Sequence, residues 1–123
     1  MPRFVVLEHE SPCGRHWDFM LERGPVLATW ALSEAPDSPG LIPAEALADH
    51  RPAYLDYEGP ISGGRGSVTR WDQGEYCMKQ EDAAGLVVSL TGNKLIGRAT
   101  LRRIGEQPAR WEFAFVPRSR TVV

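Results

Sequence analysis

Apolar and polar residues alternate in short runs along most of this chain, and turn-forming residues separate the runs. Alternation with a period of two is the pattern of a β-strand with one buried face. It predicts strands over 3–9, 16–22 and 26–32, a hairpin of 66–71 with 75–80, a second hairpin of 86–90 with 94–103, and a last strand over 111–116. The hairpins are expected to turn at 72–74 and 91–93, because both segments contain a glycine.

Four segments lack this alternation. Residues 33–43 hold three prolines and a glycine and are expected to form a loop. Pro43 is expected to begin a short helix over 44–48, because proline is tolerated at the first helical position. Residues 50–65 are expected to form an ordered loop, and 118–120 a frayed tail.

Many short strands and one short helix predict a mostly β protein, folded as a small closed or nearly closed β-barrel. An all-β chain must bury its sheet faces against each other and close its edges. The length of 123 residues suits one domain over residues 1–123. Four tryptophans and four phenylalanines supply a core, and the hydrophobic fraction of 42% argues against disorder.

The formal charge of −2 does not favour nucleic acid as a general partner, so such binding needs a local basic patch. No apolar stretch approaches the length of a membrane span, and no signal-peptide architecture is visible. A cytoplasmic location is therefore expected, with no membrane partner. Cys13 and Cys77 are then expected to be reduced thiols, and a disulfide between them is the alternative.

The second expected strand has one polar and one apolar face. Its polar face carries His16, Asp18, Met20 and Glu22, and its apolar face carries Trp17, Phe19 and Leu21. The preceding strand ends at His9, which can lie beside the polar face. Two imidazoles and one carboxylate suit a divalent ion such as Mn, Fe or Zn, with positions open for water or substrate.

Two other interpretations remain open at this point. His16 and Asp18 can form a purely structural hydrogen-bonded pair, because short motifs often match without function. Cys13 lies between the two histidines and is an alternative ligand. A thiolate, however, favours a closed zinc site and leaves Asp18 without a role.

Several further motifs follow in order along the chain. The series begins with Phe4-Val5-Val6-x-x-His9, His16-x-Asp18-Phe19-x-Leu21-Glu22, Val26-Leu27-x-x-Trp30-Ala31 and Asp49-His50-x-x-x-Tyr54. It continues with Tyr57-Glu58-Gly59-x-Ile61, Gly66-x-Val68, Trp71-Asp72-x-Gly74, Leu90-x-Gly92-x-x-Leu95-x-Gly97, Leu101-x-Arg103 and Trp111. This ordered series resembles the 3′-phosphoesterase domain of bacterial DNA ligase D.

The resemblance implies a manganese-dependent β-barrel enzyme that removes 3′-phosphates or 3′-terminal ribonucleosides from DNA or RNA primer strands in end repair. By position, it implies that His9, His16 and Asp18 bind the metal, with Zn or another divalent ion as the alternative. His50 would contact the scissile phosphate or protonate the leaving oxygen, and Tyr54 would help to position it. A repair ligase, a polymerase or an end-binding protein is the kind of protein partner implied.

One departure from the family pattern bears on activity. The family has an arginine two residues after the site aspartate, where this chain has Met20, which cannot bind phosphate. Arg15, Arg51 and Arg65 are candidates to replace it, and a solvated surface position is the alternative for each. A non-catalytic module that binds nucleic-acid ends or a repair partner, and a metal-dependent hydrolase of another small phosphoester, are the alternative functions.

Overall fold

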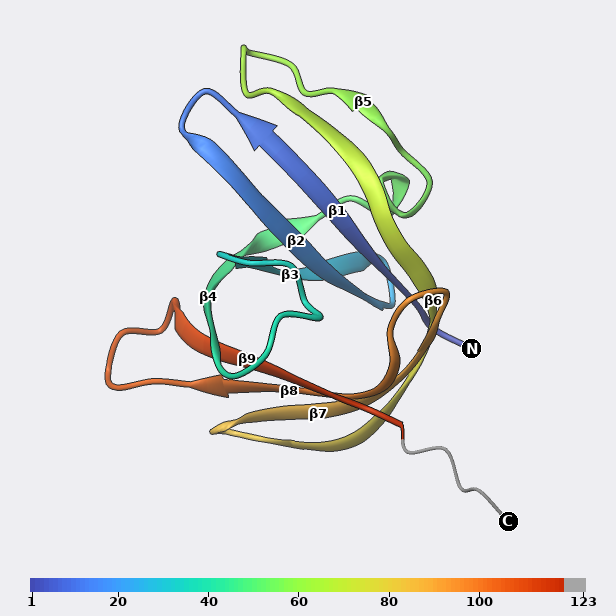
Figure 1. Cartoon of the computed structure of the whole chain (residues 1–123), viewed down its shortest axis with the longest axis vertical. Helices are drawn as coiled ribbons and strands as arrows, with labels where there is room; N and C mark the ends of the chain where they lie inside the picture. The colour runs from blue at the N-terminus through green and yellow to red at the C-terminus, as the bar shows by residue number, and fades with distance from the viewer. Residues whose placement is uncertain (119–123) are drawn as a thin grey trace.

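The computed structural model describes residues 1–118, and nearly all of its regular structure is β-strand (Figure 1). The strands are β1 Arg3–Ser11, β2 Gly14–Arg23, β3 Val26–Leu32, β4 Ile42–His50, β5 Gly59–Pro60, β6 Ser67–Asp82, β7 Gly85–Gly92, β8 Ile96–Arg103 and β9 Arg110–Pro117. One 3₁₀ helix, η1, spans Pro52–Leu55. Apart from Arg118, the expected frayed tail lies outside the described residues.

Eight of these strands close into a ring. Their order is β1-β2-β3-β4-β9-β8-β7-β6, every neighbouring pair is antiparallel, and β1 also pairs with β6 to complete the circuit. Figure 1 shows the ring as two groups of strands, β1 to β4 above and β7 to β9 below, which β6 joins at one side. The mostly β, closed or nearly closed fold expected from the sequence is confirmed.

The predicted hairpin with a turn at 72–74 is wrong, because β6 runs without a break from Ser67 to Asp82. Its first part pairs with β1 and its second part with β7, so one bent strand serves both groups. Gly74 lies at the changeover, where a Cβ would overlap the backbone of Thr91 and Gly92. The glycine marks a close approach of two strands and not a turn.

Asp72 stabilises a different turn from the one expected. Its buried carboxylate accepts hydrogen bonds from the backbone N–H groups of Asn93, Lys94 and Leu95, at 2.8, 3.1 and 2.8 Å. These residues connect β7 to β8, so the second predicted hairpin is confirmed, with its turn centred slightly later than expected. A carboxylate that accepts three backbone N–H groups fixes a turn by local hydrogen bonding.

The helix predicted over 44–48 is also wrong, because these residues belong to β4. Strand β4 lies between β3 and β9 in the ring and pairs with both of them. Backbone groups on both neighbours need partners, and this requirement outweighs a weak local preference for helix. The short helical turn occurs instead at η1, where Pro52 occupies its first position.

Two apolar clusters occupy opposite faces of β1 and β2. The larger fills the ring and includes Phe4, Phe19, Leu21 and Phe113, all of them fully buried. The smaller lies on the outer face of the sheet and contains Val5, Leu7, Met20, Leu27, Leu55 and Val68. Residues 51–65, which carry η1 and β5, cover this outer cluster, with Tyr54 and Ile61 packed against it.

No helix in the described part of the chain is long and apolar enough to cross a membrane.

Candidate metal centre and adjoining cleft

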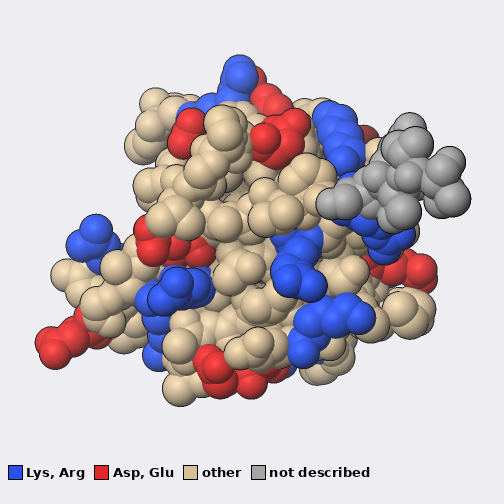
Figure 2. All heavy atoms as spheres, turned by 60° about the horizontal axis from the view of Figure 1, so that its bottom comes forward, with Lys and Arg blue, Asp and Glu red and all other residues tan. Residues whose placement is uncertain are grey.

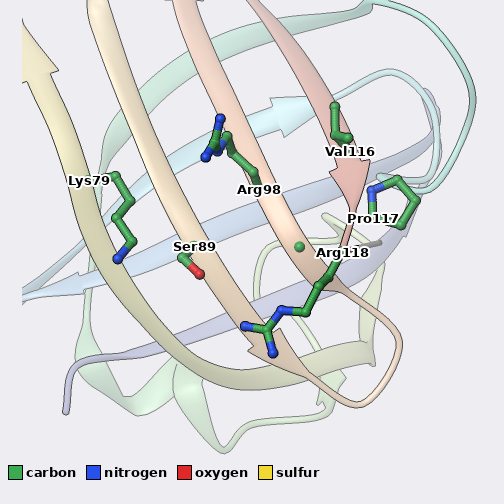
Figure 3. Close-up of a pocket in the computed structure, with 7 residues that line it drawn as sticks. Lys79, Ser89, Arg98, Val116, Pro117 and Arg118 are labelled. Atoms are coloured by element: carbon green, nitrogen blue, oxygen red, sulfur yellow. The ribbon is translucent and has the colours of Figure 1, made fainter. Parts of the chain in front are cut away.

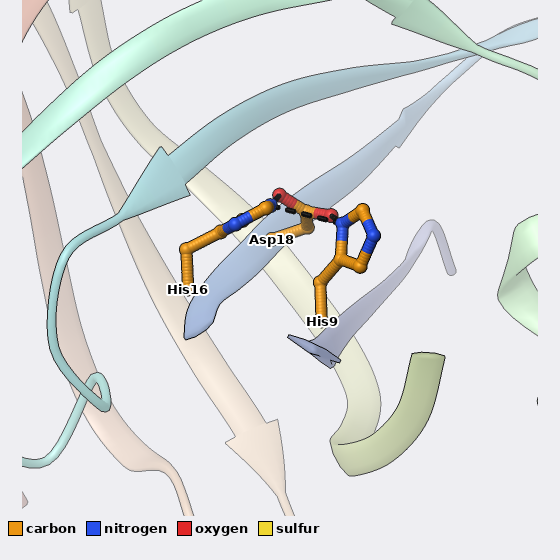
Figure 4. Close-up of side chains that lie close together, drawn as sticks. All are labelled: His9, His16 and Asp18. Carbon is orange, nitrogen blue, oxygen red and sulfur yellow. Dashed lines mark hydrogen bonds and ion pairs between the residues drawn. The ribbon is translucent and has the colours of Figure 1, made fainter. Parts of the chain in front are cut away.

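The hairpin of β1 and β2 brings two histidines together. In its antiparallel register His9 lies directly opposite His16, with a short turn at Pro12 and Cys13 between the strands. Directly opposed residues project from the same face of a sheet. Asp18, two residues after His16, lies on that face as well, so three potential ligands converge (Figure 4).

The ligand atoms of these three side chains all lie within 4.8 Å of one another. Nδ1 of His9 is 3.0 Å from Nε2 of His16, and Nε2 of His16 is 3.0 Å from Oδ1 of Asp18. The second carboxylate oxygen of Asp18 is 3.6 Å from Nδ1 of His9. Within residues 1–118, this is the only group of three or more His, Cys, Asp or Glu side chains with ligand atoms so close together.

The backbone of residue 65 fixes the orientation of His9. Nε2 of His9 is 2.7 Å from the carbonyl oxygen of Arg65, and a carbonyl oxygen only accepts hydrogen bonds. Nε2 therefore carries the proton, and in the neutral ring Nδ1 presents its lone pair to the cluster. A carbonyl partner on the distal nitrogen is the usual outer support of a metal-binding histidine.

Asp18 tests whether a cation fits this cluster. The residue is 4% exposed, and its buried Oδ1 has no partner with hydrogen-bond geometry, although Nε2 of His16 is near. A buried carboxylate without a donor is costly, and a bound cation removes that cost. Two imidazoles and a carboxylate are donors that Mn²⁺, Fe²⁺ and Zn²⁺ accept, so the residues fit a divalent ion.

The same carboxylate changes the protonation of its neighbour. Asp18, at hydrogen-bonding distance and with opposite charge, raises the pKa of His16, while partial burial of the ring acts in the opposite direction. The cluster thus attracts positive charge, whether a proton or a metal ion.

A cleft of about 220 Å³ lies beside His9, His16 and Asp18, between the outer face of the sheet and the covering segment 51–65. Its walls include His50, at the end of β4, and Tyr54, in η1. Nδ1 of His50 donates to the carbonyl oxygen of Ala48 at 2.9 Å, and the Tyr54 ring packs edge-on against the imidazole with centroids 5.5 Å apart. These contacts hold the His50 ring in one orientation.

Met20 lines the cleft as well, and it is only 1% exposed. Because it packs into the outer apolar cluster, this part of the cleft wall is apolar. The family arginine that the resemblance implies at this position has no equivalent here.

The three candidate arginines have different environments. Arg65 lines the cleft, and its guanidinium donates to the carbonyl and hydroxyl oxygens of Ser62. Arg51 lines an adjoining groove. Arg15 is not brought to the cleft, because its guanidinium pairs with Glu8 and Glu10 and it does not line this hollow.

Nothing in the sequence pointed to the Arg65 carbonyl as a partner of His9, since every residue has a backbone carbonyl. An indirect signal is Gly66, which has a φ of +90° and lies so close to β1 that a Cβ would overlap the backbone of Glu10 and Ser11. Cys13 does not join the ligand cluster, because it is exposed in the β1–β2 turn, and both Cys13 and Cys77 are free thiols.

A second hollow, of about 300 Å³, lies on the outer face of the ring over β6 to β9. Lys79, Arg98 and Arg118 line it together with Ser89 (Figure 3). Figure 2 shows that Lys and Arg side chains are spread over this face of the molecule. Among the residues that the structure describes, none of these three cations forms an ion pair, and no histidine or carboxylate lines the hollow.

Comparison with known proteins identifies the family. Residues 7–103 match the model of the DNA ligase D 3′-phosphoesterase domain. The chain belongs to this family. The matched segment contains His9, His16, Asp18, His50 and Tyr54.

Curated relatives of this 3′-phosphoesterase family member are DNA-repair proteins. The chain is 34% identical over 109 residues to the multifunctional non-homologous end joining protein LigD of Mycobacterium bovis. The aligned region covers 81% of this chain and 14% of the relative. It is 36% identical over 114 residues to the protein of the same name from Pseudomonas aeruginosa, covering 82% and 13%. The chain therefore spans about one seventh of the length of these relatives.

Proposed function

We propose that this protein is a metal-dependent 3′-phosphoesterase, which removes a 3′-phosphate or a 3′-terminal ribonucleoside from DNA or RNA strands during end repair. The observation that carries the proposal is the convergence of His9, His16 and Asp18 beside a cleft that also holds His50. We propose Mn²⁺ as the metal, with Zn²⁺ or another divalent ion as the alternative, because histidine and carboxylate donors with open positions accept each of them.

The three ligands have distinct tasks in this scheme. His9, held by the Arg65 carbonyl, presents Nδ1, and His16 presents Nε2. Asp18 supplies the negative charge that neutral imidazoles lack. A divalent ion held there polarises a phosphoryl oxygen and lowers the pKa of a coordinated water.

His50 is the proposed general acid. Its Nδ1–H is engaged by the Ala48 carbonyl, which leaves Nε2 as the nitrogen that can give a proton to the leaving oxygen. The edge-on Tyr54 ring keeps the imidazole in place, so Tyr54 serves as a positioning residue. Arg65 is the proposed phosphate contact, because it is the one residue among the three candidates that lines the cleft.

Met20 favours a second candidate function. Without a guanidinium at this position, transition-state charge on the phosphate loses a strong partner, and such a loss lowers rates by about 100- to 1000-fold. A non-catalytic module that binds nucleic-acid ends is the alternative, and a hydrolase of another small phosphoester is a third possibility. The names of the relatives assign them to non-homologous end joining, which supports a repair ligase, polymerase or end-binding protein as partner.

The first experiment measures Mn²⁺ binding by calorimetry to the metal-free protein and to Asp18→Asn. Wild type is expected to bind about one equivalent, and the variant to bind none. Because Asn keeps the shape of the side chain and removes only its buried charge, the metal-free variant is expected to remain folded, which thermal unfolding checks. Asp37→Asn, an identical change at an exposed loop position, is the control and should bind normally.

The second experiment follows Mn²⁺-dependent release of phosphate from a 3′-phosphorylated primer. Wild type and Asp37→Asn should release it, and Asp18→Asn should not. Equal turnover by wild type and Asp18→Asn would overturn the enzyme proposal. Tight binding of the primer without product over hours would favour the non-catalytic module.

A further inference from the structure

A groove of about 260 Å³ continues the cleft away from the candidate metal centre. Tyr54 and Ile61 line both hollows, so the two adjoin each other. The far wall of the groove contains Tyr57 and Pro60, and Arg51 lies at its edge on the chain just before η1. The groove belongs entirely to the segment 51–65 that covers the outer cluster.

Three rings form a row from the cleft into this groove. His50 packs edge-on against Tyr54 with centroids 5.5 Å apart, and Tyr54 packs edge-on against Tyr57 with centroids 5.9 Å apart. The row begins at the proposed proton donor and ends in the groove.

Tyr57 is both exposed and fixed in place. It is 37% exposed, yet its hydroxyl donates to the carbonyl oxygen of Pro60, and its ring lies against Tyr54. Gly59 lies close below it, since a Cβ there would come within 3.2 Å of the Tyr57 hydroxyl oxygen. An aromatic ring held open to solvent loses little entropy on binding and offers a face for stacking.

Arg51 adds a positive charge to the lining of the same groove. Its side chain is exposed, and among the described residues it forms no ion pair. The arginines Arg3, Arg15 and Arg23, in contrast, are each paired with a carboxylate. An aromatic face and an unpaired guanidinium in one groove match a nucleoside followed by its phosphate.

We propose that this groove binds the nucleoside on the 5′ side of the scissile phosphate, with its base on Tyr57 and its own 5′-phosphate near Arg51. The inference rests on the proposed function, because it takes the metal centre as the position of the scissile phosphate. In 3′-phosphate release, the 3′ oxygen of this nucleoside is the leaving oxygen. Its base lies along the ring row beyond His50, which places that oxygen near the proposed proton donor.

A consequence is that the last nucleoside of the substrate strand binds unpaired, since a base stacked on Tyr57 is removed from its duplex neighbours. The basic hollow over β6 to β9 offers no such site. Its lining holds Lys79, Arg98 and Arg118 but no aromatic residue, so it offers no ring on which a base can stack.

The test compares two 3′-phosphorylated oligonucleotides, one with a normal base and one with an abasic sugar at the last position. For wild type, the abasic end is expected to have a KM about tenfold higher, because one base–aromatic stack is lost. Tyr57→Leu should raise KM for the normal end to the abasic value and leave the abasic KM unchanged. Tyr57→Phe keeps the ring and should retain the difference.

Equal KM values of wild type for both ends would overturn the proposal, and so would a Tyr57→Leu effect that is the same for both. Dissociation constants from fluorescence anisotropy, measured in parallel, give the same comparison without turnover. If neither end yields product, the proposed enzymatic function fails, and the affinity ratio of the two ends still decides the nucleoside site.

Arg51→Gln and Arg98→Gln provide a matched pair for the phosphate contact. Arg51→Gln should reduce the slope of log affinity against log salt by about 0.7, the value for one contact to a single strand. Arg98→Gln removes the same charge from the remote hollow and should leave the slope unchanged (Figure 3). Equal slopes for wild type and Arg51→Gln would exclude the assigned phosphate contact.

Discussion

Two hollows on the outside of the same ring differ in what forms them. The cleft beside His9, His16 and Asp18 lies between the sheet and a covering segment, and it has buried apolar residues in its wall. The hollow over β6 to β9 is lined by residues of the strands themselves and of the chain just after β9. Its cations are exposed and do not converge on a buried partner.

The difference shows that charge alone does not make a reactive site. The basic hollow holds more positive side chains than the cleft, yet water screens exposed charges. In the cleft, burial of Asp18 and a fixed tautomer of His9 concentrate the interaction at one point. The segment 51–65 that covers the sheet therefore creates a partly buried polar cluster, which the exposed strand faces of the other hollow do not form.

The largest expected effect tests whether chemistry is confined to the cleft. His50→Gln keeps a side chain of similar polarity but removes the imidazole that is the proposed proton donor. It is expected to lower kcat for 3′-phosphate release at least 100-fold while Mn²⁺ affinity stays unchanged. Steady-state kinetics and calorimetry on the same preparation measure both quantities.

Arg98→Gln is the matched change in the other hollow and should leave kcat within twofold of wild type. A similar loss of kcat in both variants would mean that the two hollows act together. Loss of Mn²⁺ binding in His50→Gln would make His50 a ligand instead of an acid.

The second effect tests the covering segment. Gly66→Ala places a Cβ into the backbone of Glu10 and Ser11, so the chain at residue 65 must move away from His9. Without the Arg65 carbonyl on Nε2, Mn²⁺ affinity measured by calorimetry is expected to fall about 10- to 100-fold.

Gly64→Ala is the control that separates the effect of backbone strain from the effect of moving the Arg65 carbonyl. Gly64 also has a positive φ, of +68°, but a Cβ there meets nothing within 4 Å. This control is expected to lower the unfolding temperature and to keep wild-type Mn²⁺ affinity. If Gly66→Ala bound Mn²⁺ as tightly as Gly64→Ala, the carbonyl would not support the site.

The smallest effect tests the apolar part of the cleft wall. Met20→Arg introduces the guanidinium that the family pattern has at this position. One charge-assisted contact to phosphate is expected to lower KM for 3′-phosphorylated primers about tenfold. Because Met20 is buried among apolar side chains, the free energy of unfolding should also fall by about 1–3 kcal/mol.

Met20→Leu is the control, since it keeps volume and polarity, and its KM should match wild type. Chemical denaturation supplies the stability of both variants. An unchanged KM in a folded Met20→Arg would show that the substrate phosphate does not lie over this residue.

The local pattern predicted one of the two hairpins correctly, and it indicated the polar strand face whose side chains the structure brings together. Alternation over 16–22 separated an apolar face from the face of His16 and Asp18, and the structure places Phe19 inside the ring and Asp18 in the cleft. These features are local, because side-chain direction alternates along any strand. The motif series, in its order along the chain, was enough to indicate the family.

Other features depended on distant partners and were missed. Residues 44–48 become a strand because β3 and β9 both need hydrogen-bond partners there. Asp72 and Gly74 look like a turn in the sequence. In the structure Asp72 accepts a hydrogen bond from the β7–β8 turn, and Gly74 packs closely against the backbone of β7. The sequence pattern does not distinguish an aspartate or glycine that forms a turn in its own segment from one that contacts a distant segment.

By itself, the sequence determined which chemical groups are present and which strand faces they occupy, because these follow from residue identity and a period of two. Only the tertiary structure decided that His9 lies opposite His16, that the Arg65 carbonyl holds His9, and that Arg15 pairs with glutamates away from the cleft. The physical reason is that strand register, loop packing and ion pairing are contacts between different segments of the chain, and their energies depend on how those segments fold together.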